Sequence, residues 1–307
     1  MTRIVTGQSA GVTEEAAWPP PGMSFDEITV LGSHLAFVIG GRGDTVLFLH
    51  GNPTSSFLWR RVLPGLTGSA RCVALDLIGM GRSGKPEIGY GFADHAAYLE
   101  AFADRLELRD VTVVGHDWGA VLALDLLRRR PDVVGRIAVC EGHLHPFGRF
   151  EDMGPGGGDL FARLRTPGVG EQLVLQENYF VERILPDGMS RLLSPAELDV
   201  YRAPFPTVRD RLPVLRWIQQ IPVAGDPADV DAVVRRNQDV LLRDPAPRLL
   251  LHGEPGSVVG PAEVDWCRRE GTGLEIVSVG AGTHFLPEEQ PEALSHALAA
   301  WLATGRR

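Results

Sequence analysis

The sequence predicts an α/β protein with a mostly parallel central sheet that is flanked by helices. Short apolar runs alternate with segments of helical spacing as far as residue 141, and strands that alternate with helices in this way pair in parallel. The alternation returns after residue 226, whereas residues 142–225 carry helical patterns between Gly- and Pro-rich loops. We therefore expect one sheet with a helical segment inserted into it.

The expected elements follow in order along the chain. Apolar runs of strand length that end in turn residues predict strands, and apolar residues at a spacing near 3.6 predict helices. The predicted strands cover residues 28–39, 44–49, 72–75, 111–114, 136–140, 248–252 and 274–279. The predicted helices cover residues 57–66, 92–107, 118–130, 228–243 and 291–302.

These elements divide the chain into three parts. Residues 1–21 are polar and rich in proline, which predicts a flexible arm. Residues 22–141 and 226–307 form the expected core domain, and residues 142–225 form a helical cap domain.

Composition excludes several classes of partner. The 307 residues are 44% hydrophobic, which supports a large core, and the net charge of −9 argues against nucleic acid or an anionic membrane. No apolar run approaches the roughly 20 residues that span a bilayer, and the first 21 residues lack the apolar core of a signal peptide. The three cysteines are an odd number, and their spacing is not that of metal ligands. These features predict a cytoplasmic protein without a metal, and they leave its oligomeric state open.

A glycine-flanked turn, Gly115-His116-Asp117-Trp118-Gly119, follows the apolar run 111–114 and precedes a helix. A strand, a sharp turn and a helix with this spacing are typical of the nucleophile elbow of α/β-hydrolases, where glycines permit a strained backbone. Here the lifted residue is Asp117, and a carboxylate is already ionised at neutral pH, so it needs no base to become a nucleophile. The alternative is an aspartate that only caps the next helix, but the two flanking glycines favour a nucleophile.

His284 is the best candidate for the base. It follows the last predicted strand, and in α/β-hydrolases the chain order is nucleophile, acid and then histidine. Two residues are candidates for the acid, because Glu141 and Glu254 each follow a predicted strand. The local sequence leaves this choice open.

Two further residues point to an anion site. Asn52 follows the strand 44–49 in the turn His50-Gly51-Asn52-Pro53, and Trp118 follows the proposed nucleophile. Their backbone N–H groups are positioned for an oxyanion hole, while the amide and the indole supply two more donors. Each residue alone would suit a structural role in a turn or a core. Together beside Asp117 they favour binding of a halide ion.

The motifs resemble those of the haloalkane dehalogenases, in particular the subfamily whose acid is a glutamate after the sixth strand. The resemblance covers nearly the whole chain after residue 25 and rests on residues 50–60, 76–86, 115–119, 180–182, 201–205, 221–225 and 284–289. It implies that Asp117 is the nucleophile, Glu141 the acid, His284 the base, and Asn52 with Trp118 the halide-stabilising pair. Under the resemblance the acid is Glu141 and not Glu254.

The resemblance also implies the wall of a substrate pocket, formed by Phe180, Ile184, Gly188, Trp217, Val258 and Phe285. The chain departs from the family pattern at three places. Residues 142–146 include two histidines where relatives usually have bulkier apolar residues, Ile218 stands where a proline is common, and Gly188 replaces a larger side chain at the expected tunnel mouth. These departures bear on the range of substrates.

The implied reaction is hydrolysis of a haloalkane to an alcohol, a halide ion and a proton through an alkyl ester on Asp117, with no metal or organic cofactor. Two other enzymes use a similar site. An epoxide hydrolase would need a pair of cap tyrosines, for which only Tyr179 and Tyr201 are present, and a luciferase-like oxygenase shares the same five residues. A non-catalytic binding protein is disfavoured because the triad is complete.

Overall fold

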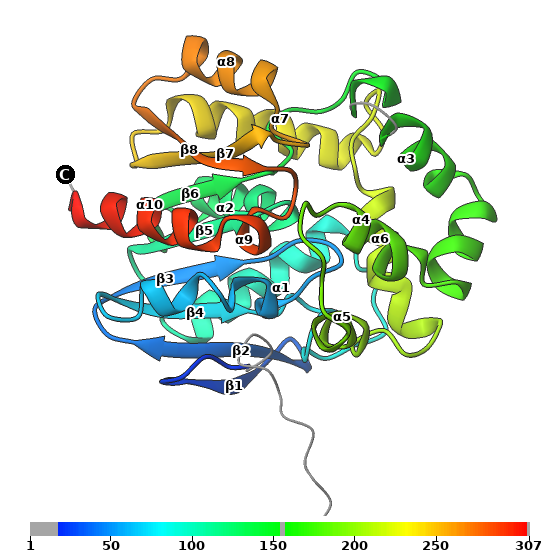
Figure 1. Cartoon of the computed structure of the whole chain (residues 1–307), viewed down its shortest axis with the longest axis horizontal. Helices are drawn as coiled ribbons and strands as arrows, with labels where there is room; N and C mark the ends of the chain where they lie inside the picture. The colour runs from blue at the N-terminus through cyan, green and yellow to red at the C-terminus, as the bar shows by residue number, and fades with distance from the viewer. Residues whose placement is uncertain (1–17, 154–156, 306–307) are drawn as a thin grey trace, which may run out of the picture.

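The computed structural model describes residues 18–153 and 157–305, so most of the expected arm lies outside the described residues. Eight strands form a single sheet in the spatial order β1-β2-β4-β3-β5-β6-β7-β8 (Figure 1). Only the pairs β1/β2 and β2/β4 are antiparallel, and every other pair is parallel. The predicted fold class is confirmed. The strands are β1 (Met23–Val30), β2 (Ser33–Gly41), β3 (Asp44–Leu49), β4 (Ala70–Leu75), β5 (Val111–His116), β6 (Val134–Cys140), β7 (Arg248–Pro255) and β8 (Leu274–Gly282).

The first predicted strand, residues 28–39, is wrong, because the chain forms two strands there. β1 and β2 pair as a hairpin around Leu31 and Gly32, both of which have a positive φ. Leucine rarely adopts the left-handed backbone conformation that turns of this kind require. The sequence pattern therefore did not predict a turn at Leu31. The turn after β2 also does not make a hairpin, because β4 lies between β2 and β3.

Both faces of the sheet are apolar and covered. Side chains alternate between the two faces of a strand, and in β3 Leu47 and Leu49 lie in one buried cluster while Val46 and Phe48 lie in the other. The first cluster contains residues of α1 (Phe92–Arg105), α2 (Trp118–Arg129) and α7 (Ala228–Arg243), and the second contains residues of α10 (Pro291–Ala303). Because helices cover both faces of the sheet, the parallel strands have apolar residues at consecutive positions in the sequence. Two shorter helices, α8 (Pro261–Glu270) and α9 (Leu286–Glu289), complete the region after β7.

Between β6 and α7 the chain forms helices that gather beside one end of the sheet (Figure 1). Among the described residues of this segment, the only β contacts are isolated bridges that Val223 makes with Phe147 and Asp226. The helical elements are η4 (Phe150–Met153), α3 (Gly157–Arg165), the π-helices η5 (Glu171–Gln176) and η6 (Phe180–Ile184), α4 (Leu185–Asp187), α5 (Pro195–Arg202), η7 (Arg209–Arg211) and α6 (Leu212–Gln219).

A buried charged cluster joins α5 to the core. Arg60 forms ion pairs with Glu197 of α5 and Glu288 of α9, and Arg191 pairs with the same two glutamates. The hydroxyl of Tyr201 donates to Glu288. We call these five residues the Arg60 cluster. Two arginines facing two glutamates leave no unpaired excess charge in a site of low polarity.

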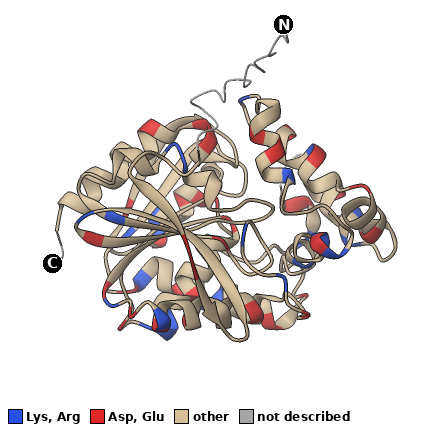
Figure 2. Cartoon of the chain, turned by 90° about the horizontal axis from the view of Figure 1, so that it is seen from below, with Lys and Arg blue, Asp and Glu red and all other residues tan. Residues whose placement is uncertain are grey.

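Charged residues elsewhere are interspersed, with acidic and basic side chains on neighbouring elements (Figure 2). Across residues 18–153 and 157–305, every helix is too short or too polar to cross a membrane.

Candidate active site

The elbow holds Asp117 in a strained backbone at the end of β5. Its φ is 53° and its ψ is −123°, a conformation that a residue with a side chain rarely adopts. A Cβ on Gly115 would lie 2.5 Å from the carbonyl oxygen of Gly119, and a Cβ on Gly119 would lie 2.2 Å from that of Leu49. Only glycine therefore allows strand and helix to meet closely enough to present Asp117.

A backbone donor holds one oxygen of the Asp117 carboxylate. The N–H of Asn52 donates to Oδ2 at 2.8 Å, and the neighbouring N–H of Trp118 also favours the charged form of the carboxylate. Gly51 makes this approach possible, because a Cβ there would lie 2.2 Å from Oδ2. Burial raises the pKa of Asp117, and the charge of His284 and these two N–H donors oppose that rise.

His284 lies on the loop after β8 and faces Glu141. Its Nδ1 is 3.5 Å from Oε2 of Glu141, and Oε2 also accepts the backbone N–H groups of Ser257 at 3.2 Å and Val258 at 2.8 Å. The other candidate acid, Glu254, is exposed and accepts a hydrogen bond from Ser278. The structure thus brings Glu141 and not Glu254 to the histidine.

The surroundings of His284 favour its charged form. Burial lowers the pKa of this histidine, but the hydrogen bond with Glu141 and the negative charges of Asp117, Glu141 and Glu289 outweigh burial and raise the pKa above its ordinary value. The ring of His116 lies 4.8 Å from that of His284, and its Nε2 lies 2.7 Å from the His284 carbonyl oxygen. Since a carbonyl oxygen only accepts, Nε2 of His116 carries the proton and helps to fix the loop.

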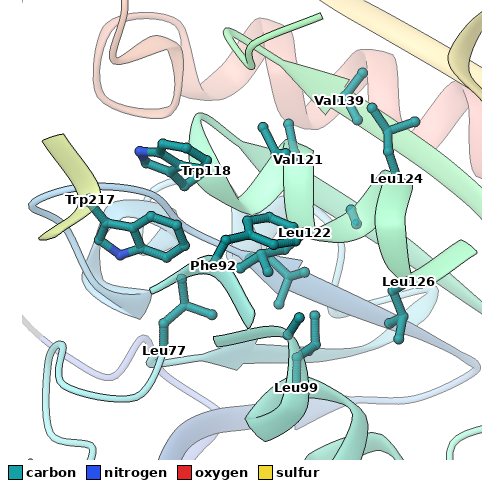
Figure 3. Close-up of a cluster of buried hydrophobic side chains, with 14 of the residues drawn as sticks. Leu77, Phe92, Leu99, Trp118, Val121, Leu122, Leu124, Leu126, Val139 and Trp217 are labelled. Carbon is teal, nitrogen blue, oxygen red and sulfur yellow. The ribbon is translucent and has the colours of Figure 1, made fainter. Parts of the chain in front are cut away.

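Asn52 and Trp118 are both neighbours of Asp117. Asn52 contacts it through its backbone N–H, and Trp118 is the next residue in the chain. Asn52 is 5% exposed, and its Nδ2 donates to the carbonyl oxygen of Val214 in α6 at 3.2 Å. Trp118 is 1% exposed and stacks on Trp217, with ring centroids 4.5 Å apart and planes at 26°. The two indole side chains are labelled in Figure 3. The two donors are therefore held in a largely water-excluded site, where hydrogen bonds to an anion are strongest.

The predicted pocket residues divide between the two cores. Phe180 and Trp217 belong to the same buried cluster as Trp118, and Ile184 and Val258 pack against that cluster. Phe285 lies in the second cluster, with its ring centroid 4.7 Å from that of His284.

Gly188 does not leave empty space. A Cβ there would lie 3.0 Å from the Phe285 ring and 2.9 Å from the carbonyl oxygen of Ile184. The space beside the glycine is taken by the ring of Phe285, so the missing side chain does not by itself open the structure at this position.

Three other histidines surround the site, and the sequence pattern gave them no role. His50 accepts the N–H of Leu77 at 3.0 Å and so links the turn before Asn52 to the loop after β4. His116 supports His284, as described above. His143 lies with Nε2 3.8 Å from Oδ1 of Asp117. The only sequence signal for His143 is the unusual Gly142-His143 pair directly after Glu141.

The arrangement brings together a buried carboxylate, a histidine that faces a second carboxylate, and amide and indole N–H groups. These are the kinds of group that covalent catalysis at a carboxylate and stabilisation of a departing anion require. Within the described ranges, no group of three or more His, Cys, Asp or Glu side chains is placed to hold a metal ion.

The chain is similar to known proteins over most of its length. Residues 44–175 match the model of the alpha/beta hydrolase fold family. The chain is 46% identical over 282 residues to a haloalkane dehalogenase of Mesorhizobium japonicum, covering 90% of each chain, and 40% identical to one of Bradyrhizobium diazoefficiens, covering 89% of this chain and 92% of that one.

Solved structures agree as well. The haloalkane dehalogenase DbeA from Bradyrhizobium elkani has a TM-score of 0.89 at 40% identity, with 92% of this chain and 98% of that chain covered. DatA from Agrobacterium tumefaciens C58 has a TM-score of 0.88 at 36% identity, with 95% and 99% covered.

Proposed function

The chain belongs to the haloalkane dehalogenases, hydrolases that cleave carbon–halogen bonds, and we propose that it does so through a covalent ester on Asp117. The observation that carries the proposal is the surroundings of the buried Asp117 carboxylate. The backbone N–H of Asn52 donates to its Oδ2, the pair of His284 and Glu141 lies near enough to influence its pKa, and Trp118 is the next residue.

In the first step, Oδ1 of Asp117 attacks the carbon that carries the halogen. The carbon–halogen bond breaks as the carbon–oxygen bond forms, and the halide leaves with the bonding electrons toward the amide of Asn52 and the indole of Trp118. A carboxylate suits this displacement at a saturated carbon because it is charged without a base. The site is nearly closed to solvent, so the two donors stabilise the halide strongly.

In the second step, His284 takes a proton from a water molecule that attacks Cγ of the ester. Negative charge develops on Oδ2, where the N–H of Asn52 already donates at 2.8 Å. Glu141 orients the ring of His284 and stabilises its positive charge. The bond between Cγ and Oδ1 then breaks, and the alcohol leaves with Oδ1 and receives the proton from His284. The other proton of the water molecule is left on the carboxyl group of Asp117, which releases it to solvent as the proton of the overall reaction and becomes a carboxylate again.

The substitution His284→Phe tests this scheme. We expect one equivalent of halide from 1,2-dibromoethane or 1-iodohexane, no further turnover, and a protein mass increased by the alkyl group. His296→Phe, which changes a histidine in α10 away from the site, is the matched control and retains turnover. Steady turnover by the His284→Phe protein would overturn the two-step scheme.

Neither alternative enzyme is supported. An epoxide hydrolase needs tyrosines free to protonate the substrate, and the hydroxyl of Tyr201 instead donates to Glu288 in the Arg60 cluster. Diol formation from styrene oxide, or light from coelenterazine, would favour the epoxide hydrolase or the oxygenase.

We propose that residues 142–225 act as a cap over a core of residues 22–141 and 226–307. The described part of 142–225 supplies Trp217, which stacks on Trp118, and Val214, whose carbonyl oxygen accepts a hydrogen bond from Asn52. We also propose a small haloalkane and water as substrates. A cytoplasmic location is supported by the three buried free cysteines, Cys72, Cys140 and Cys267.

A further inference from the structure

His143 is a buried histidine that faces the nucleophile and has no place in the scheme above. It is 4% exposed, and its Nε2 lies 3.8 Å from Oδ1 of Asp117, the oxygen opposite the one that Asn52 holds. Its Nδ1 is buried, and no residue of the described chain hydrogen bonds to it. The pocket therefore contains a polar ring whose nitrogen Nε2 points at the oxygen that attacks the substrate.

The neighbours of His143 fix its ring. A Cβ on Gly142 would lie 2.5 Å from that of Ala120, so the glycine lets the loop after Glu141 pass close to α2 and brings the next residue to Asp117. The ring is edge-on to Trp118, with centroids 5.2 Å apart at 68°, and to Phe147, with centroids 5.6 Å apart at 80°. Packed between two aromatic rings, it keeps its direction.

The surroundings of His143 favour its neutral form. Burial and the positive charges of His284 and His145 lower its pKa to about 3. A neutral imidazole has one N–H donor and one acceptor nitrogen, and facing an ionised carboxylate the form with hydrogen on Nε2 has the lower energy. The donor therefore points at Oδ1.

We propose that Nε2–H of His143 donates a hydrogen bond to the alkyl oxygen of the ester and stabilises that oxygen as the alcohol leaves. This proposal rests on the proposed function, because Oδ1 becomes the alkyl oxygen only if Asp117 is the nucleophile. A separation of 3.8 Å exceeds a hydrogen bond, but such contacts are often long in the free enzyme and tighten in the reacting complex.

Hydrolysis of the ester does not require a proton from His143. Water adds to Cγ while its proton passes to His284, and negative charge collects on Oδ2. When the intermediate collapses, the bond between Cγ and Oδ1 breaks and Oδ1 takes the electron pair. His284 returns the proton to Oδ1, and the other proton of the water leaves the regenerated carboxyl group of Asp117 for solvent. His143 keeps its own proton while it stabilises the developing charge.

The first test separates the two chemical steps in His143→Phe. Rapid mixing with 1,2-dibromoethane gives the rate of the first halide release, and steady turnover reports ester hydrolysis. We expect the first rate to be unchanged or faster, because the donor also stabilises the carboxylate before attack. Ester hydrolysis should slow by about 10²-fold, a typical effect of losing one donor to a developing anion. His143→Gln, which keeps an N–H, should recover much of the loss.

The second test uses the acidity of the departing alcohol. If His143 stabilises the alkyl oxygen, its loss should slow hydrolysis more for the ester from 1-bromopropane than for that from 1,2-dibromoethane, whose alcohol is more acidic and leaves more easily. A purely structural role would slow both esters equally. His143→Leu carries the same comparison if the Phe variant does not fold.

His145→Phe is the matched control, because His145 lies on the same loop but pairs with Glu263 at 3.7 Å, away from Asp117. Its two rates should stay at those of the parent enzyme. Unchanged hydrolysis in His143→Phe, or equal slowing of both esters, overturns the role of His143. Failure of Asp117 as nucleophile is a different result, since His284→Phe would then accumulate no ester.

Discussion

Nδ1 of His284 and Oε2 of Glu141 lie 3.5 Å apart, and the same Oε2 accepts the N–H of Val258 at 2.8 Å. One carboxylate oxygen therefore connects the loops that follow β6, β7 and β8. Its position depends on all three loops, and it holds the base that the proposed second step requires.

We expect Glu141→Gln to lower kcat by on the order of 10⁴-fold at neutral pH, because an amide neither stabilises the imidazolium nor selects the correct form of the ring. The first halide release should persist, so rapid-mixing kinetics would show a burst. The matched control is Glu254→Gln, which changes an exposed glutamate near the end of the neighbouring strand β7. Loss of activity in the control but not in Glu141→Gln would assign the acid to Glu254.

Ester hydrolysis should fall as the pH decreases, because a protonated His284 cannot accept a proton from water. The Asp117 charge is among the causes that raise the pKa of His284 in the free enzyme, and alkylation removes that charge. The pKa that governs hydrolysis of the ester should therefore be lower than the pKa of His284 in the free enzyme. NMR titration of the free enzyme and pH-dependent single turnovers measure the two values, and equal values would contradict this reasoning.

Asn52→Ala and Trp118→Phe should each slow the first halide release by roughly 10²- to 10³-fold, since each removes a donor to the departing anion. Hydrolysis of an ester already formed should change much less. Trp59→Phe removes an equally buried indole N–H in the second core and should leave halide release intact. Unchanged halide release in both site variants would remove these residues from the halide site.

Arg60→Met should lower the free energy of unfolding by about 3–5 kcal/mol, because it leaves two buried glutamates with too few partners. Urea unfolding at neutral pH measures this change. The control is Arg243→Met, whose pair with Asp239 is exposed and contributes little. A similar, small change in both variants would show that the Arg60 cluster does not need its buried arginine.

Local sequence located Asp117 and His284 because each follows a strand in a glycine-rich turn, which is a short-range signal. It did not separate Glu141 from Glu254. Glu141 is the first residue after β6 and has a φ of 50°, whereas Glu254 is still inside β7, opposite Ala281 of β8. Where a strand ends is decided by its neighbours in the sheet, so only the resemblance to a family favoured Glu141 in advance.

The contact between His143 and Asp117 also could not be predicted from the local sequence. Nothing near it in the sequence connects it with Asp117, which lies 26 residues earlier. The contact arises because β5 and β6 are parallel neighbours and Gly142 lets the loop approach α2. The spacing of the residues in the sequence predicts neither the pairing of β5 with β6 nor the close approach of the loop to α2.

The Arg60 cluster also bears on attempts to exchange substrate range between relatives. Helix α5 supplies Glu197 and Tyr201, while the core supplies Arg60 and Glu288. Glu288 lies four residues after His284. A chimaera that receives a foreign segment in place of residues 142–225 would have to match this pattern of charges. A segment without matching charges would disturb the loop that carries His284, as well as the substrate-binding surface that the exchange was meant to change.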